Sequence, residues 1–161
     1  MFARQIGRAA ISALALGGAM LANATAFAED AEKTVLTRMF EWWNVAYNDD
    51  EPMTAEGFSQ YFTDDIVFVI NGRRSEKGLQ SLAERFNALK PNYPHIRISL
   101  PMREEFAEGD KIFTYHVNQG RNSESDPWSG ETHVMGYVVV KDGKIDFLNF
   151  LQYDKPETPD E

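Results

Sequence analysis

The strongest constraint on the fold is a β-hairpin predicted over residues 132–153, near the C-terminal end. Two runs rich in β-branched and aromatic residues, 132–140 and 145–153, flank the dipeptide Asp142-Gly143. A two-residue type I′ turn needs positive φ at both central positions, and Asp-Gly adopts that conformation readily. The dipeptide therefore predicts a tight hairpin turn.

This turn also predicts how the two strands pair. With Asp142 and Gly143 in the loop, Lys141 faces Lys144 and Tyr137 faces Leu148. Side chains alternate between faces along a strand, so this register predicts two sets. The first set is His133, Met135, Tyr137, Val139, Asp146, Leu148, Phe150 and Gln152, and the second is Val134, Gly136, Val138, Val140, Ile145, Phe147, Asn149, Leu151 and Tyr153. Both sets are mostly apolar, so we expect both faces to be covered.

Residues 1–28 are predicted to be a secretory signal peptide. Arg4 and Arg8 give a positively charged start, 9–22 is an apolar run, and 26–28 is an Ala-Phe-Ala cleavage pattern. The apolar run is too short to span a bilayer comfortably. We therefore expect a periplasmic or secreted protein that has no membrane contact after cleavage.

After cleavage, residues 29–154 are long enough for one domain with its own core, and 155–161 are predicted to be a disordered tail. The chain has no cysteine, so the stability of this exported protein must come from packing. The net charge of −9 argues against binding to nucleic acid, because such a surface repels phosphate. The three histidines match no metal motif, and no phosphate-binding or nucleotide-binding fingerprint is present, so we expect neither metal nor cofactor.

Hydrophobic periodicity predicts an α+β fold. Helices are expected over residues 32–48 with Asp30 as N-cap, from the N-cap Thr54 onward, and over residues 76–90 with Ser75 as N-cap. Strands are expected over residues 66–70, 95–106 and 111–119, followed by the hairpin. This order predicts three N-terminal helices packed on a bent antiparallel sheet.

Three local strings carry a resemblance to a known family. They are Tyr61-Phe-Thr-Asp-Asp-Ile-Val-Phe before and within the first strand, Ser75-Glu-Lys-Gly-Leu at the third helix, and Val138-Val-Val-Lys-Asp-Gly-Lys-Ile at the hairpin. In this order they resemble the nuclear transport factor 2-like superfamily, especially its SnoaL-like members. The resemblance implies a cone-shaped α+β barrel with a pocket between sheet and helices. The superfamily includes isomerases, cyclases and hydrolases as well as binding and assembly modules, so the resemblance fixes no activity.

The steroid isomerases of that superfamily use a Tyr on the first helix, an Asp base and an Asp acid. The resemblance places these at Trp43, Ile70 and Tyr137, none of which matches, so an isomerase of that kind is disfavoured. Tyr137 could still donate a hydrogen bond to a ligand oxygen.

The predicted register and the resemblance together indicate a ligand pocket. Its expected lining is Trp43, Tyr47, Phe68, His133, Met135, Tyr137 and Phe150. Such a set suits a small, largely apolar molecule with one or two polar contacts. His133, Tyr137 and His116 are the candidates for catalysis if the protein is a lyase, isomerase or cyclase. A ligand-free dimerisation module is a further alternative, and Arg73-Arg74 is a candidate contact for an anionic ligand.

The second set of hairpin residues would face water in a single-layer sheet. Soluble monomers rarely expose so large an apolar patch, so we expect a two-fold homodimer that packs sheet against sheet. The resemblance implies the same association.

Overall fold

The computed structural model describes residues 33–155. The segment predicted as a signal peptide, the N-cap expected at Asp30 and most of the predicted tail lie outside the described residues. The helices are α1 (Val35–Asn48), α2 (Ala55–Ser59) and α3 (Leu79–Leu89). The strands are β1 (Phe62–Ile70), β2 (Arg73–Arg74), β3 (His95–Ile98), β4 (Glu104–Glu108), β5 (Lys111–Arg121), β6 (Ser129–Lys141) and β7 (Lys144–Asp154).

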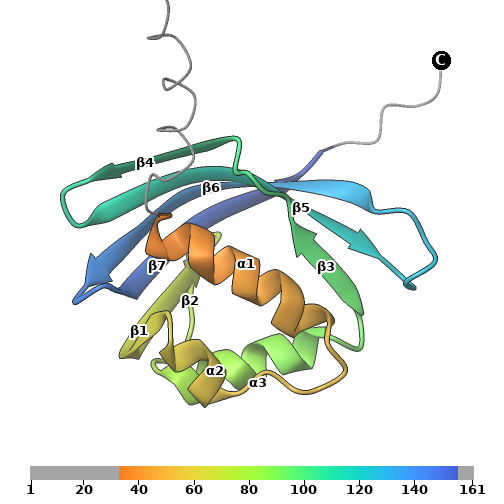
Figure 1. The fold of residues 1–161 in the computed structure, drawn as a ribbon, viewed down its shortest axis with the longest axis horizontal. Helices are drawn as coiled ribbons and strands as arrows, with labels where there is room; N and C mark the ends of the chain where they lie inside the picture. The colour runs from red at the N-terminus through yellow and green to blue at the C-terminus, as the bar shows by residue number, and fades with distance from the viewer. Residues whose placement is uncertain (1–32, 156–161) are drawn as a thin grey trace, which may run out of the picture. The chain divides into compact units, whose positions relative to one another are not determined.

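The strands form one curled sheet whose inner face is covered by the helices (Figure 1). The strand order is β2-β1-β7-β6-β5-β3, and β4 also pairs with β5. Every pairing is antiparallel except that of β1 with β7, which is parallel. The predicted α+β architecture is therefore confirmed, although the parallel pair was not anticipated.

The first two helices start at side chains that bond the exposed amides of the first turn. Thr34 accepts from the backbone N–H of Thr37, so Thr34 is the N-cap of α1, and helix α1 starts later than the predicted residue 32. Thr54 caps α2 as predicted.

The start of the third helix was predicted three residues too early. Helix α3 begins at Leu79 after Gly78, which provides no side-chain cap. Ser75, the expected cap, instead accepts a hydrogen bond from the backbone N–H of Phe68 at 3.0 Å. The hydroxyl of Ser75 therefore ties the segment before α3 to β1.

The single strand predicted over residues 95–106 is two strands, β3 and β4, which pair with opposite halves of β5. The segment between them contains Pro101, which has no N–H to donate to a ladder. One long strand was therefore the wrong interpretation of an otherwise alternating pattern.

The hairpin turn forms as predicted, but the strands beyond it pair one residue out of the predicted register. Asp142 and Gly143 have φ of 51° and 76°, and Lys141 faces Lys144. Between Val139 and Val140 the register shifts, so that Tyr137 faces Asn149 instead of Leu148. A β-bulge at Asp146 therefore separates the turn from the rest of the hairpin.

The bulge is held from the neighbouring strand. The hydroxyl of Thr63 in β1 donates to Asp146 Oδ1 at 2.7 Å. The backbone N–H of Ile145 donates to the carbonyl of Tyr61 at 2.8 Å. Hydrogen bonds with β1 and with the residue before it therefore hold the bulged part of β7 in place.

The bulge reverses the predicted faces of β6. Val134 and Val138 are fully buried inside, whereas Met135 is 44% exposed on the outer face. The predicted faces of β7 are correct, since Leu148 and Phe150 are buried and Leu151 is exposed.

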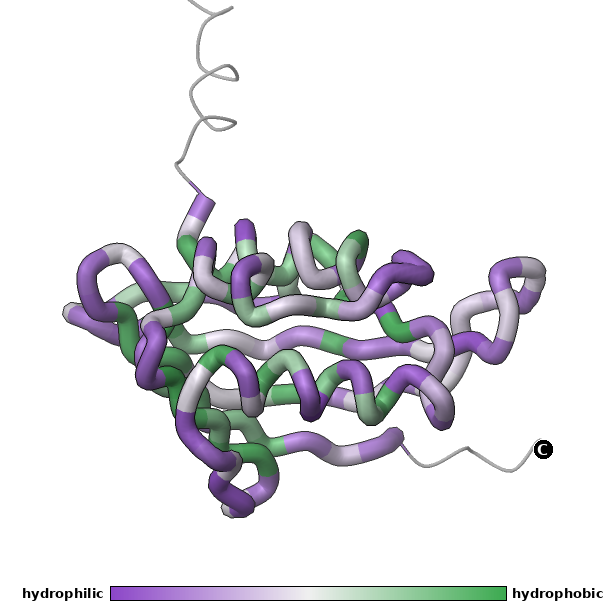
Figure 2. Tube along the Cα trace, turned by 90° about the horizontal axis from the view of Figure 1, so that it is seen from below, coloured by the Kyte–Doolittle hydropathy of each residue, from purple (hydrophilic) through white to green (hydrophobic). Residues whose placement is uncertain are grey.

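The core lies between the helices and the inner face of the sheet. In Figure 2, hydrophobic and hydrophilic residues alternate along the helices, as expected for helices that pack one side on a core. The buried aromatic residues of this core include Trp43, Phe58 and Phe62. Within residues 33–155, no helix is long and apolar enough to cross a membrane.

Candidate functional site

A cavity of about 910 Å³ lies between α1, α3 and the inner face of the sheet. Its lining is apolar where α2, β1 and α3 meet and polar toward the end of β5, the start of β6 and the end of β7. The apolar residues include Met39, Trp43, Phe58, Phe62, Phe68, Phe86 and Leu148. The polar residues include His116, Asn118, Thr132, Gln152 and Asp154. The volume is within the range of small-molecule sites.

The apolar end is built from aromatic rings that pack against one another. Phe86 of α3 stacks on Phe58 of α2 with 5.7 Å between ring centroids. The same ring meets Trp43 edge-on at 5.8 Å and Phe68 edge-on at 6.2 Å. These contacts join three helices to β1, so the aromatic end is a rigid apolar wall.

The polar end is produced by strand alignment. Asn118 of β5 faces Thr132 of β6, which in turn faces Asp154 of β7. In the neighbouring row, His116 and Gln152 flank Val134. Because directly opposed residues share a face, these polar side chains all lie on the inner face. We call His116, Asn118, Thr132, Gln152 and Asp154 the polar strip.

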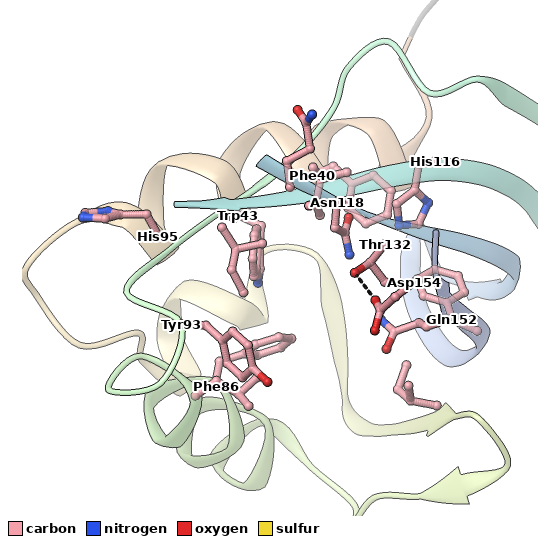
Figure 3. Close-up of a pocket in the computed structure, with 18 of the residues that line it drawn as sticks. Phe40, Trp43, Phe86, Tyr93, His95, His116, Asn118, Thr132, Gln152 and Asp154 are labelled. Carbon is pink, nitrogen blue, oxygen red and sulfur yellow. Dashed lines mark hydrogen bonds between the residues drawn. The ribbon is translucent and has the colours of Figure 1, made fainter. Parts of the chain in front are cut away.

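The polar strip is only partly satisfied by its own hydrogen bonds. The hydroxyl of Thr132 donates to Asp154 Oδ1 at 2.6 Å. Asn118 Oδ1 is buried and has no hydrogen-bond partner among the described residues. Figure 3 shows Asn118, Thr132, Gln152 and Asp154 gathered on one side of the cavity, facing Phe86 and Tyr93 across it. Arg121 Nε, from the same lining, is a buried donor that likewise has no partner among the described residues, and each such unsatisfied group costs free energy.

His116 joins the polar strip to the apolar wall. Only 2% of the residue is exposed, and its ring contacts Phe40 at 4.6 Å and Phe150 at 5.4 Å between centroids. Its Nδ1 lies 3.0 Å from the hydroxyl oxygen of Thr114. Burial lowers the pKa of His116 from 6.5 to about 4, so the imidazole is neutral at neutral pH.

The surroundings of Thr114 favour one tautomer of His116. The Thr114 hydroxyl donates to Met102 Sδ at 3.0 Å, which uses its only hydrogen. The oxygen can then accept from His116 only if Nδ1 carries the proton. In that tautomer Nε2 has a free lone pair, and no hydrogen bond within residues 33–155 uses it.

The buried histidine predicts a pH-dependent stability. Between pH 6.5 and pH 4 the unfolded chain binds a proton at His116 that the folded chain does not, so stability falls as the pH falls. We expect the free energy of unfolding to drop by roughly 2 kcal/mol from pH 7 to pH 5 through this residue. Urea unfolding of wild type and His116→Gln at both pH values measures the contribution of His116, as the difference in how far the free energy of unfolding falls. Equal pH dependence in both proteins would contradict the expectation.

The structure divides the predicted site residues into two groups. Trp43, Phe68 and Phe150 line the cavity as predicted. His116, a candidate for catalysis that was not among the predicted lining residues, is part of the wall. Tyr47 is fully buried behind this lining, where it stacks on Trp43 at 4.5 Å and donates to the carbonyl of Tyr93. Burial raises the pKa of Tyr47 to about 12, as expected for a structural phenol.

His133, Met135 and Tyr137 do not line the cavity, because the bulge at Asp146 turns them to the outer face. His133 pairs with Val117 and is therefore on the opposite face from His116. There it stacks on Tyr153 at 5.0 Å between centroids. His116 and His133, both candidates for catalysis, therefore do not share one site.

Sequence reasoning missed Asn118, Thr132, Gln152 and Asp154. Only Asn118 could have been found from the sequence, because Thr114, His116 and Asn118 alternate along β5 and so share one face. The partners on β6 and β7 could not be found without the bulge.

Within residues 33–155, no group of three or more His, Cys, Asp or Glu side chains is placed to hold a metal ion. What the site offers is an apolar wall, a neutral imidazole and a row of hydrogen-bonding groups.

Comparison with known proteins gives structural matches only. No family model matches the sequence, and the search of curated proteins found no match. A candidate SnoaL-like polyketide cyclase from Jannaschia sp. CCS1 is similar, with a TM-score of 0.57 and 12% identity over 73% of this chain and 82% of that one. An epoxide hydrolase-like protein from M. tuberculosis has a TM-score of 0.52 and 17% identity over 74% and 83% of the two chains.

A third solved structure is an NTF2-like protein of unknown function from Exiguobacterium sp. 255-15. Its TM-score is 0.55, with 18% identity over 77% of this chain and all of that one. At such identities the likeness concerns the fold. The chain therefore has the nuclear transport factor 2-like fold, as found in SnoaL-like proteins.

Proposed function

We propose that this is an exported protein that binds a small, largely apolar molecule in the cavity between α1, α3 and the sheet. The observation that carries the proposal is a cavity of about 910 Å³ whose wall combines aromatic rings with unpartnered polar atoms. A protein with no ligand would be more stable with this space filled, since buried voids and unsatisfied polar groups both cost free energy. This argues against the ligand-free dimerisation module.

The structural neighbours are consistent with the proposal. Among them are candidate polyketide cyclases, a candidate isomerase of the SnoaL-like family and an epoxide hydrolase-like protein. The predicted signal peptide, residues 1–28, supports export.

The binding proposal can be tested with a neutral apolar fluorophore, N-phenyl-1-naphthylamine. We expect saturable binding with a rise in fluorescence, since the cavity removes the probe from water. Leu89→Trp places a bulky ring in the cavity lining and should weaken binding at least about tenfold.

Val45→Trp is the matched control, because Val45 is 71% exposed on α1 and does not line the cavity. It should leave the affinity unchanged. If the wild-type protein shows no saturable binding, or both variants bind equally well, the proposal fails.

An enzyme is the second candidate, and His116 is the residue that favours it. Its neutral imidazole lies in the cavity wall, and in the favoured tautomer Nε2 is free to accept a proton from a bound substrate. His116 would then act as the general base of an isomerase, lyase or cyclase, in place of the sequence candidates His133 and Tyr137. Turnover that falls with protonation of a group of low pKa, and that is lost in His116→Gln, would distinguish this reading from simple binding.

A further inference from the structure

We propose that the polar strip binds the hydrogen-bond-donating end of an amphipathic ligand, a hydroxyl or amide N–H, while the apolar remainder lies against the aromatic wall. This inference rests on the proposed binding function and specifies the chemical class of the ligand. It excludes a ligand whose polar end is a carboxylate or another anion.

The argument comes from which groups still have hydrogens to donate. Thr132 uses its hydroxyl hydrogen on Asp154 Oδ1, so Thr132 Oγ1 presents only lone pairs to the cavity. The carboxylate of Asp154 has no hydrogen, and its second oxygen is not used in any hydrogen bond within residues 33–155. Two neighbouring groups of the polar strip are therefore acceptors only.

Asn118 and His116 extend the row of acceptors. The side-chain oxygen of Asn118 is buried without a partner among the described residues. In the tautomer set by Thr114, His116 Nε2 is also an acceptor. The side-chain amides of Asn118 and Gln152 also carry hydrogens, so donors are present at these two positions, whereas Thr132 and Asp154 offer lone pairs only. A ligand that donates satisfies these groups, whereas an anion would meet lone pairs and the charge of Asp154.

The spacing suits a compact polar end. Asn118, Thr132 and Asp154 are successive partners across three strands, and directly opposed side chains have Cβ atoms about 4.5–5.5 Å apart. A hydroxyl or amide between two of these side chains is within hydrogen-bonding reach of both. Figure 3 shows these side chains side by side at the cavity wall.

Positive charge also borders the cavity, but at residues outside the polar strip: Arg85, Arg121 and Lys155 belong to the lining. Arg85 is shared with an adjoining hollow of about 440 Å³, which Arg73 also lines. An anionic ligand would be drawn to these cations rather than to the carboxylate of Asp154. The two possibilities therefore predict opposite preferences among ligands of equal size.

A matched set of naphthalene probes tests the preference by isothermal titration calorimetry at pH 7. 2-Naphthol donates a hydrogen bond, 2-methoxynaphthalene only accepts, and 2-naphthoate is an anion. We expect 2-naphthol to bind at least about tenfold more tightly than 2-methoxynaphthalene, and 2-naphthoate to bind most weakly.

Two substitutions assign the preference to the polar strip. Asn118→Leu should reduce the advantage of 2-naphthol to about threefold or less, because an acceptor is lost while apolar contact is kept. Asp154→Asn removes the charge at an exposed position and should strengthen 2-naphthoate binding several-fold. Gln80→Leu removes an exposed amide outside the cavity and should change none of the affinities.

The outcomes separate this inference from the function on which it rests. Equal affinity for 2-naphthol and 2-methoxynaphthalene would overturn the inference and leave apolar binding intact. Tightest binding of 2-naphthoate would also overturn it and would point to the cations that border the cavity. Failure of all three probes, together with N-phenyl-1-naphthylamine, would overturn both.

Discussion

Replacing Gly136 with alanine is expected to lower the free energy of unfolding by about 3 kcal/mol or more, at the upper end of overpacking effects. A Cβ at this position of β6 would lie 2.0 Å from the carbonyl oxygen of Asn149 and 2.9 Å from the Cα of Phe150. Both atoms belong to the backbone of β7, so they cannot move aside without distorting the hairpin. The melting temperature should fall by on the order of 10 °C, or the chain should fail to fold.

The close approach has a structural purpose. Gly136 faces Phe150, and a Cβ would also lie 2.7 Å from Cδ1 of the Phe150 ring. Phe150 lines the cavity and contacts His116, so the missing side chain at position 136 makes room for one wall of the site.

Gly120→Ala is the matched control, since Gly120 also lies on a central strand and its added Cβ would be 3.6 Å from the carbonyl oxygen of His95. That is an ordinary contact, and we expect a change of less than about 1 kcal/mol. Thermal and urea unfolding followed by circular dichroism compare the two. Similar melting temperatures for both variants would show that β7 yields and that the close approach is unimportant.

Leu151→Glu is expected to convert a homodimer into a folded monomer. No helix of the described residues covers the outer face of the sheet (Figure 1). Leu151 is 62% exposed, Tyr153 48% and Met135 44%. We propose that a second copy of the chain covers this face by a two-fold contact, which would bury the same side chains on both partners.

The substitution chosen for this test depends on the observed register. Val138, which the predicted register placed on the outer face, is fully buried inside, so Val138→Glu would damage the core instead of the interface. Leu151 is on the outer face in both the predicted and the observed arrangement. A glutamate there would place two like charges at a two-fold contact, where water is excluded.

Val45→Glu is the control, because Val45 is an equally apolar and more exposed residue on α1. Light scattering at tens of micromolar should give a dimer for wild type and Val45→Glu, and a monomer for Leu151→Glu with unchanged circular dichroism. A monomeric wild-type protein at that concentration would refute the proposal.

The sequence predicted the local structure of this chain better than its long-range pairing. Asp142-Gly143 was sufficient to place the turn, because positive φ at both positions is a local property. Thr54 was recognised as a cap for the same reason. The bulge at Asp146 depends on Thr63 and Tyr61, which are more than 80 residues away, as the separation of 83 between Thr63 and Asp146 indicates. No local pattern in the hairpin encodes that contact.

The site residues on β6 were predicted wrongly because this strand is apolar on both faces. Val134 and Val138 on one face compete with Met135 and Tyr137 on the other, so alternation alone does not select which pair is buried. The predictions for Trp43, Phe68 and Phe150, which do not lie on β6, were right, since all three line the cavity.

The bulge at Asp146 also has a consequence for how this hairpin can change during evolution. If the bulge were lost while Asp146 stayed in the chain, Val139 would face Asp146 and Tyr137 would face Leu148, so β6 would turn its other face inward. His133, Met135 and Tyr137 would then replace Val134 and Val138 at the interior, without a substitution at any of those positions. One strand thus encodes two alternative linings, and whether Asp146 is paired or bulged decides which of them a ligand would meet.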